Sequence, residues 1–250
     1  MRHVASTALL VAALPACSAP GRTVRIAAAS DLARAFEEVG RAFEAKTGIT
    51  PVFTFDSSGL LAKKIDEGAP YALFASANRD FAADVVAHGH CDASSLRPYA
   101  QGRIVVWTAA GTPAPTTLAE LADPRFKRVA IANPEHAPYG KAAKQALERA
   151  GLWDSLQSKL ELGESVQATM QYARTGAVDA AIVALSLALV TDGGAFAPID
   201  QALYDPLEQD LVVCGSGDAA DAARRFADFV ASPDGRAVMT RYGFSLPHAP

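Results

Sequence analysis

Residues 24–47 read VRIAAASDLARAFEEVGRAFEAKT and join a short apolar segment, 24–28, to an amphipathic one, 32–47, through Ser30. Apolar residues in the second segment recur at spacings of three and four, which indicates a helix, and the first segment is typical of a buried strand. The same alternation continues along the chain. It predicts further strands at 50–55, 73–77, 102–108, 128–132, 180–183 and 210–214, and further helices at 60–67, 80–88, 140–150, 166–175 and 219–231. Alternation of this kind predicts an α/β fold with a mostly parallel sheet.

The stretch 110–117 interrupts this alternation near the middle of the chain, because it contains Gly111, Pro113 and Pro115. Glycine and proline mark loops and linkers. We therefore expect two lobes, with the chain leaving one lobe for the other near this stretch.

Charge and length limit the function classes. The 250 residues include 23 Lys and Arg against 27 Asp and Glu, which gives a formal net charge of −4. A nucleic-acid-binding protein carries a basic surface, so we expect no nucleic-acid partner. An anion bound by this chain must be held locally by a few placed donors.

The N-terminus has the pattern of an export signal, which we assign to residues 1–19. Arg2 precedes the apolar run 4–14, and small residues follow it. No later stretch reaches the roughly 18 apolar residues of a membrane span. Residues 14–17, Leu-Pro-Ala-Cys, also resemble a bacterial lipobox, so a periplasmic protein and one anchored through a lipid on Cys17 both stay open.

Cys91 and Cys214 remain once Cys17 is removed or lipidated. Disulfides persist outside the cytoplasm. With 122 residues between the two cysteines, a disulfide and two inert buried thiols both stay open.

Four strand-to-helix turns look alike, because each begins a helix with small or neutral residues. Helix N-termini expose unpaired N–H groups and partial positive charge, and such turns gather at the carboxyl ends of parallel strands. They could therefore converge from two lobes on one small anion without any Lys or Arg. Each serine alone is also explained as an ordinary N-cap. The turns are Ser30 with Asp31, Ser57-Ser58-Gly59, Pro138-Tyr139-Gly140 and Glu164-Ser165-Val166.

The sequences of these turns and of the segments near them, in this order, resemble those of the periplasmic molybdate-binding proteins of ABC importers. The resemblance extends over nearly the whole mature chain. The resemblance implies the two-lobed type II periplasmic binding protein fold, with a mostly parallel mixed sheet in each lobe and the ligand cleft between them. We expect residues 24–100 plus 218–250 to form lobe 1, and residues 101–217 to form lobe 2. The matching segments are 27–32 (AAASDL), 57–59 (SSG), 68–77 (GAPYALFASA), 131–140 (IANPEHAPYG), 182–189 (IVALSLAL) and 241–244 (RYGF).

Carried over residue by residue, the resemblance implies that Ser30 and Ser58 donate to the oxyanion through their hydroxyl and N–H groups. Tyr139 and Val166 would donate N–H groups from the other lobe. We further assign the Tyr139 hydroxyl to the anion, because the strand that carries a donor tyrosine in some relatives has Ala184 here.

The N–H of Asp31 is a further candidate donor, since its carboxylate would repel an anion if it pointed inward. The implied protein is a monomer that holds no cofactor or metal cation. It carries molybdate or tungstate as ligand and serves an ABC permease in the inner membrane. Neutral donors would disfavour phosphate, whose proton would lack an acceptor.

Two positions depart from the resemblance, because Ala72 and Asn78 replace acidic residues of the family. Their loss could change the position of the Ser58 turn, so the same fold binding sulfate, phosphate or chromate stays an alternative. An organic carboxylate is disfavoured, because no turn holds an Arg for bidentate pairing.

Enzyme alternatives have weaker support. The run 88–92, His-Gly-His-Cys-Asp, contains metal-ligand residue types, but its spacing suits a solvated loop better. The run 215–220 imitates a dinucleotide-binding turn, but too few residues follow it for a complete βαβ unit. A nucleophile and base among Ser30, Ser58 and His136 would make a hydrolase, although no known hydrolase motif supports it.

Overall fold

The computed structural model describes residues 22–247. Its first strand and first helix lie close to the segments expected within residues 24–47. Strand β1 (Arg22–Ala29) leads through a single 3₁₀ turn, η1 (Ser30–Leu32), into helix α1 (Ala33–Thr47). The helix ends at Gly48, whose φ of 68° lies in the left-handed region that glycine adopts readily. Its apolar residues at spacings of three and four, among them Phe36 and Phe43, are fully buried. The expected export signal and Cys17 lie outside the described residues.

A five-stranded sheet forms the core of the first lobe, in the order β2-β1-β3-β10-β4. Strands β1, β2 and β3 are parallel, and β10 runs antiparallel to both of its neighbours. The other strands of this sheet are β2 (Ile49–Asp56), β3 (Leu73–Ala75), β4 (Arg97–Gly102) and β10 (Leu207–Val213).

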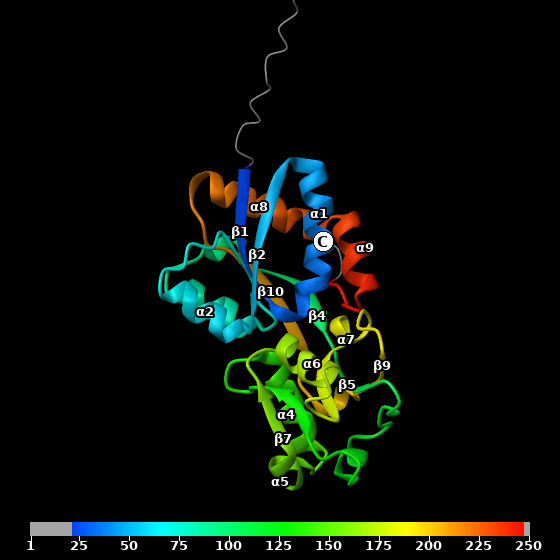
Figure 1. Ribbon diagram of the computed structural model, residues 1–250. Coiled ribbons are helices and arrows are strands. Elements are labelled where there is room, and N and C mark those ends of the chain that lie inside the picture. Colours follow the sequence, from blue (N-terminus) through cyan, green and yellow to red (C-terminus); the bar gives the residue numbers. More distant parts are fainter. Residues whose placement is uncertain (1–21, 248–250) are drawn as a thin grey trace, which may run out of the picture.

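The second lobe repeats this plan with the order β7-β6-β8-β5-β9, in which β5 is the antiparallel strand. Figure 1 shows the two sheets as separate layers, one in each lobe. The structure thus confirms the expected two-lobed α/β fold with a mostly parallel mixed sheet in each lobe. The strands are β5 (Ile104–Ala109), β6 (Val129–Ala132), β7 (Leu160–Gly163), β8 (Ala180–Ala184) and β9 (Gly194–Pro198).

Helices cover both faces of the first sheet. Aromatic residues of α1 and α8, including Phe36, Phe43 and Phe226, pack on one face, and Leu61 and Val85 of α2 and α3 pack on the other. These helices, with α9 beside α1, are α2 (Ser58–Asp66), α3 (Arg79–Ala87), α8 (Gly217–Ala231) and α9 (Pro233–Arg241).

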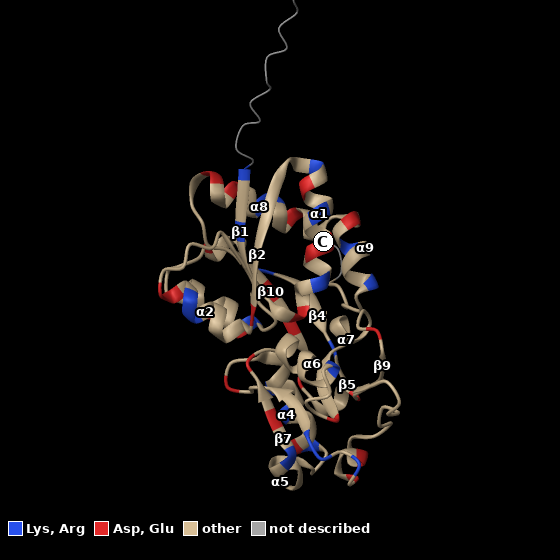
Figure 2. Cartoon of the chain, viewed as in Figure 1, with Lys and Arg blue, Asp and Glu red and all other residues tan. Residues whose placement is uncertain are grey.

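The second lobe has its own helices, of which α4 and α6 begin at the ends of β6 and β7. None of the helices in residues 22–247 is long and apolar enough to pass through a membrane. Figure 2 shows basic and acidic residues interspersed over both lobes. The helices are α4 (Pro138–Arg149), α5 (Trp153–Leu156), α6 (Val166–Arg174) and α7 (Leu185–Ala188), and the short 3₁₀ turns of the chain are η2 (Ala93–Ser95), η3 (Leu118–Ala122), η4 (Gln157–Lys159) and η5 (Gln201–Leu203).

The two places at which the chain changes lobes agree only in part with the expected ones. The strand expected at 102–108 corresponds to β5, whereas β4 was not expected, and the chain crosses between the sheets at Arg103, close to the expected boundary at 101. The stretch 110–117 therefore lies inside the second lobe. The chain returns between β9 and β10, because β10 pairs with β3 and β4 of the first sheet although we expected residues 101–217 in lobe 2. We propose the crossings at Arg103 and between Pro198 and Leu207 as the lobe boundaries.

Sequence patterns missed six of the strands and α-helices in the described residues, namely β4, β7, β9, α5, α7 and α9. β9, for example, has the sequence GAFAP with little burial and is defined by its pairing with β5. Its hydrogen-bond partner lies far away in the chain, so no local periodicity could indicate it.

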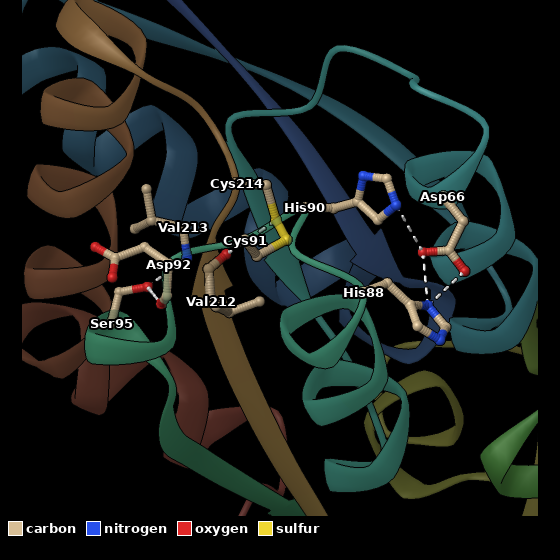
Figure 3. Close-up of a disulfide and its surroundings, with 9 residues drawn as sticks. All are labelled: Asp66, His88, His90, Cys91, Asp92, Ser95, Val212, Val213 and Cys214. Atoms are coloured by element: carbon tan, nitrogen blue, oxygen red, sulfur yellow. Dashed lines mark hydrogen bonds and ion pairs between the residues drawn. A yellow bond between two sulfur atoms is a disulfide. The ribbon is translucent and has the colours of Figure 1, made fainter.

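A disulfide joins Cys91, which follows α3, to Cys214, which follows β10. Figure 3 shows the disulfide beside the segment that carries Asp92 and Ser95, next to Val213 at the end of β10. There the Asp92 N–H donates to Val213 O at 2.8 Å, and the Val213 N–H donates to the Ser95 hydroxyl oxygen at 2.9 Å. The structure decides in favour of pairing.

Candidate oxyanion site between the lobes

A small cavity lies between the lobes, at the carboxyl ends of several strands. It brings together all five residues that the sequence analysis selected, which sit at the starts of η1, α2, α4 and α6. The lining residues are Ala29, Ser30, Asp31, Asp56, Ser57, Ser58, Ala77, Ala137, Pro138, Tyr139 and Val166. Four turns from two lobes therefore converge on one cavity, and no Lys or Arg lines it.

Backbone N–H groups at this cavity belong to the first turns of helices, where the helix itself supplies no acceptor. Ser58 and Val166 are the first residues of α2 and α6, and Tyr139 follows Pro138 at the start of α4. Ser165, the N-cap of α6, accepts from the Ala168 N–H through its side chain, so it caps the helix and leaves the Val166 N–H to the cavity. The ends of three helices thus direct donors and partial positive charge at one place.

The two serine hydroxyls differ in their surroundings. Ser58 Oγ accepts a hydrogen bond from the Ala77 N–H at 2.9 Å, so its own proton stays available for a ligand. Ser30 Oγ makes no hydrogen bond to another described residue. Both serines are buried, at 2% and 0% exposure for Ser30 and Ser58.

Asp31 is fully buried, and its carboxylate is held by two donors. Its Oδ2 accepts from the Tyr139 hydroxyl at 2.9 Å and from Gln209 Nε2 at 2.8 Å. Burial raises the pKa of Asp31 to about 6, although these hydrogen bonds lower it in part. Burial also raises the pKa of Tyr139 well above its usual value, so its hydroxyl keeps its proton.

This geometry corrects two expectations. The single proton of the Tyr139 hydroxyl is donated to Asp31, so the hydroxyl is not a free donor to an anion. The wall is also not made of neutral donors alone, because Asp31 and Asp56 line it. Asp56 is satisfied by the Ser57 N–H and by Lys64, whose Nζ lies 2.7 Å from Oδ2.

Contacts between the lobes surround the cavity. The Gly59 N–H donates to His136 O at 2.9 Å, and Ser57 Oγ lies 2.8 Å from His136 Nδ1. A Cβ on Gly59 would lie 2.8 Å from that carbonyl oxygen, so only glycine fits without a shift. The Ser186 hydroxyl, from α7, donates to Asp31 O at 2.8 Å. The lobes are therefore closed on each other around the cavity.

Sequence reasoning missed Gln209 and the partner of His136. Gln209 lies in β10 and is completely buried, and its Oε1 accepts from the Tyr99 hydroxyl at 2.9 Å. The expected strand began only at residue 210, and Gln209 stands between Glu208 and Asp210, so no local signal marked it as buried. His136 contacts Ser57, not Ser30 or Ser58, so the structure does not bring together the nucleophile and base considered above.

The departures at Ala72 and Asn78 leave the Ser58 turn in place. Asn78 caps α3 by accepting the Phe81 N–H at 3.1 Å, as an aspartate would. Ala72 is buried, and its carbonyl accepts from the N–H groups of Cys214 and Gly215.

The structure also shows the surroundings of residues 88–92, the run that contains metal-ligand residue types. Figure 3 shows His88 and His90 on either side of Asp66, with His88 Nδ1 3.2 Å from its carboxylate. Cys91 is in the disulfide and offers no thiolate. No group of three or more His, Cys, Asp or Glu suited to a metal ion occurs in residues 22–247. After β10, that same part of the chain adds α8 and α9 but no further strand of a sheet, so the run 215–220 begins no βαβ unit.

Comparisons with known proteins agree with this geometry. Residues 24–245 match the family model described as bacterial extracellular solute-binding protein. The molybdate-binding protein ModA of Rhodobacter capsulatus is 32% identical over 98% of this chain and 96% of its own length. A putative ABC transporter substrate-binding lipoprotein of Bacillus subtilis is 29% identical over 89% of this chain and 86% of its own length. The solved periplasmic molybdate-binding protein of Azotobacter vinelandii superposes with a TM-score of 0.85 at 28% identity, covering 90% of this chain and 100% of that chain.

Proposed function

Because the chain belongs to the family of bacterial extracellular solute-binding proteins, we propose that it captures molybdate or tungstate and delivers it to an ABC permease. The observation that carries this proposal is the convergence of the Ser30, Ser58, Tyr139 and Val166 turns on one cavity between closed lobes. The names of the relatives from Rhodobacter capsulatus and Azotobacter vinelandii point to the same ligand.

Oriented N–H groups explain how an acidic chain can bind a dianion. The proposed donors are the N–H groups of Asp31, Tyr139 and Val166, and the N–H and hydroxyl groups of Ser30 and Ser58. Each helix N-terminus carries about half a positive charge, and a closed cavity keeps water from screening it. Charged residues of both signs are spread over the two lobes (Figure 2), so the net charge of −4 does not describe the cavity, whose wall contains Asp31 and Asp56.

Cavity size and donor chemistry set the selectivity that we propose. Molybdate and tungstate are slightly larger than sulfate and equally charged, so the fit of the cavity must separate them from sulfate. Hydrogen phosphate carries a proton that needs an acceptor, and the unpaired Oδ1 of Asp31 is a candidate for it, so the fit of the cavity must separate phosphate as well. Sulfate, phosphate and chromate are therefore the competing ligands to test.

Delivery would follow from closure of the lobes. The contacts of His136 with Ser57 and Gly59 form only when the lobes meet, so closure presents a changed surface to a permease. We propose a monomer exported to the periplasm. The relative from Bacillus subtilis, described as a lipoprotein, supports the option of an anchor at Cys17, and loss of acylation in a Cys17→Ser variant would test it.

A thermal-shift panel tests the ligand. Purified protein is melted with molybdate, tungstate, sulfate, phosphate and chromate, each at the same concentration. A ligand at about 100 times its Kd stabilises the folded state by about 2.7 kcal/mol, which raises the Tm clearly. We expect shifts with molybdate and tungstate.

Two variants make the panel specific for the cavity. Ser30→Ala combined with Ser58→Ala should remove the shift, and Ser155→Ala, at an exposed serine of α5, should keep it. A shift with sulfate, phosphate or chromate and none with molybdate or tungstate would refute the proposed ligand.

A further inference from the structure

The Asp31 carboxyl is the one group of the cavity wall that is buried with an unused oxygen. Its Oδ2 accepts two hydrogen bonds, whereas its Oδ1 has no partner among the described residues. Two other buried side-chain atoms in the described part of the chain lack a partner, on Trp107 and Gln201, and neither residue lines the cavity. An unpaired carboxylate oxygen in such a place is costly, so it calls for a role.

No cation faces this carboxyl from the elements packed against it. From α4 comes Tyr139, from β10 Gln209, and from β4, through Gln209, comes Tyr99. α7 contributes only the Ser186 hydroxyl, which binds the Asp31 backbone. Burial accordingly raises the pKa of Asp31 to about 6 even before any ligand is present.

Two more ionisable side chains lie at the cavity edge. Asp56 is paired with Lys64 at 2.7 Å, so its charge is compensated. The His136 imidazole contacts Ser57, and its Nε2 lies 3.9 Å from the exposed carboxylate of Glu164. His136 is therefore the residue whose replacement serves as the control for Asp31.

A bound dianion would share the cavity with the Asp31 carboxyl. Two like charges in a closed, poorly hydrated space disfavour each other, and the weaker acid then holds a proton. Because molybdate and tungstate are fully ionised at neutral pH, the proton must go to the protein.

We propose that Asp31 takes up one proton from solvent when the lobes close on a doubly charged oxyanion, so that capture of the ligand is coupled to protonation. This inference rests on the proposed function. The proton joins Oδ1, because Oδ2 already accepts from Tyr139 and Gln209, and the carboxylate becomes a neutral carboxyl. The charge state of the Asp31 carboxyl thereby determines how tightly the site binds the oxyanion. This role is separate from any hydrogen bond that the Asp31 N–H donates to the ligand.

The sign of the pH dependence follows from this uptake. In the range between the pKa of Asp31 in the free protein and its higher pKa in the complex, each unit of rising pH weakens binding by up to about tenfold. Above that range the affinity is low and constant, and below it the affinity is high and constant.

Isothermal titration calorimetry tests the coupling. Molybdate is titrated into the protein at about pH 7 in buffers of different ionisation enthalpy, and the slope of the observed enthalpy gives the number of protons taken up. For the wild type we expect a number approaching one, and a Kd that rises with pH. Asp31→Asn should bind molybdate with no proton uptake and a flat pH profile, since the amide keeps an acceptor for Tyr139.

His136→Gln is the matched control, because glutamine can still bond to Ser57 but does not titrate. It should keep the uptake. Uptake that disappears in His136→Gln, persists in Asp31→Asn or is absent from the wild type would overturn the inference. Absence of molybdate binding in the wild type would instead refute the proposed function, so the two failures are distinct. The wild-type proton count stands by itself if Asp31→Asn fails to fold.

Discussion

Replacing Ser58 by alanine removes one oxygen with two separate roles. In the protein, Ser58 Oγ accepts the Ala77 N–H at 2.9 Å, and both residues are buried. Loss of this acceptor leaves the N–H unpaired, which costs about 1–3 kcal/mol. For a domain of this size each kcal/mol lowers the Tm by about 2–4 °C, so the ligand-free variant should melt about 2–12 °C lower.

The same oxygen carries the proton that we assign to the anion. A hydrogen bond to a charged group is worth about 1.5–3 kcal/mol, so the Kd for molybdate should rise about 10- to 150-fold. Ser30→Ala is the matched comparison. The Ser30 hydroxyl has no partner among the described residues, so its loss should weaken binding similarly and leave the ligand-free Tm nearly unchanged.

Differential scanning calorimetry of the ligand-free proteins and calorimetric titration with molybdate measure the two effects independently. A Ser58→Ala protein that melts like the wild type would refute the structural role of the hydroxyl. Wild-type affinity in both serine variants would refute the assignment of the two hydroxyls to the ligand.

Three further outcomes follow from the structure. Gly102→Ala places a Cβ against the Tyr139 hydroxyl, so it should break the hydrogen bond from Tyr139 to Asp31 and weaken molybdate binding about tenfold or more, as measured by titration calorimetry. Unchanged affinity would contradict the role of that hydrogen bond between the lobes. Replacing both Cys91 and Cys214 by serine removes a cross-link between residues separated by 123 positions, so the unfolded chain gains entropy and the free energy of unfolding, measured with urea, should fall by about 5 kcal/mol while the molybdate Kd stays the same. A fall of less than about 1 kcal/mol would contradict this account. Burial raises the pKa of Asp31 from 3.8 to about 6, so the folded state binds the proton of this carboxyl more tightly than the unfolded state, and the free energy of unfolding should fall by about 1.4 kcal/mol per pH unit as the pH rises from about 4 to 6. Asp31→Asn should lack this fall, and an identical slope in both proteins would contradict the prediction.

Local features of the site were predictable from the sequence. Ser30, Ser58, Tyr139 and Val166 each follow a strand and begin or precede a helix, and both the strand and the helix leave patterns within a few residues. Parallel strands place such turns at one edge of a sheet, so their meeting could be anticipated. The same local reasoning misplaced the return to the first lobe, because β10 belongs to the first sheet through its pairing with β3 and β4, which lie far away in the chain.

The chemistry of Asp31 was not predictable in this way. Its carboxylate meets Tyr139 and Gln209, which lie 108 and 178 residues away in the chain. Next to Ser30, the sequence shows only an acid in a first helical turn, a common and usually solvated place. Its burial, and with it the raised pKa, depends on how two lobes close over it.

The sequence by itself determined the α/β alternation, the four turns that line the cavity and the likeness to molybdate-binding relatives, because each of these depends on residues that are neighbours in the chain. Only the tertiary structure decided that Cys91 meets Cys214, that the Tyr139 hydroxyl serves Asp31 and that a carboxyl with a free oxygen stands in the cavity wall. The physical reason is that burial and the hydrogen bonds of a buried charge are set by groups brought together from distant segments, and such meetings leave no local pattern.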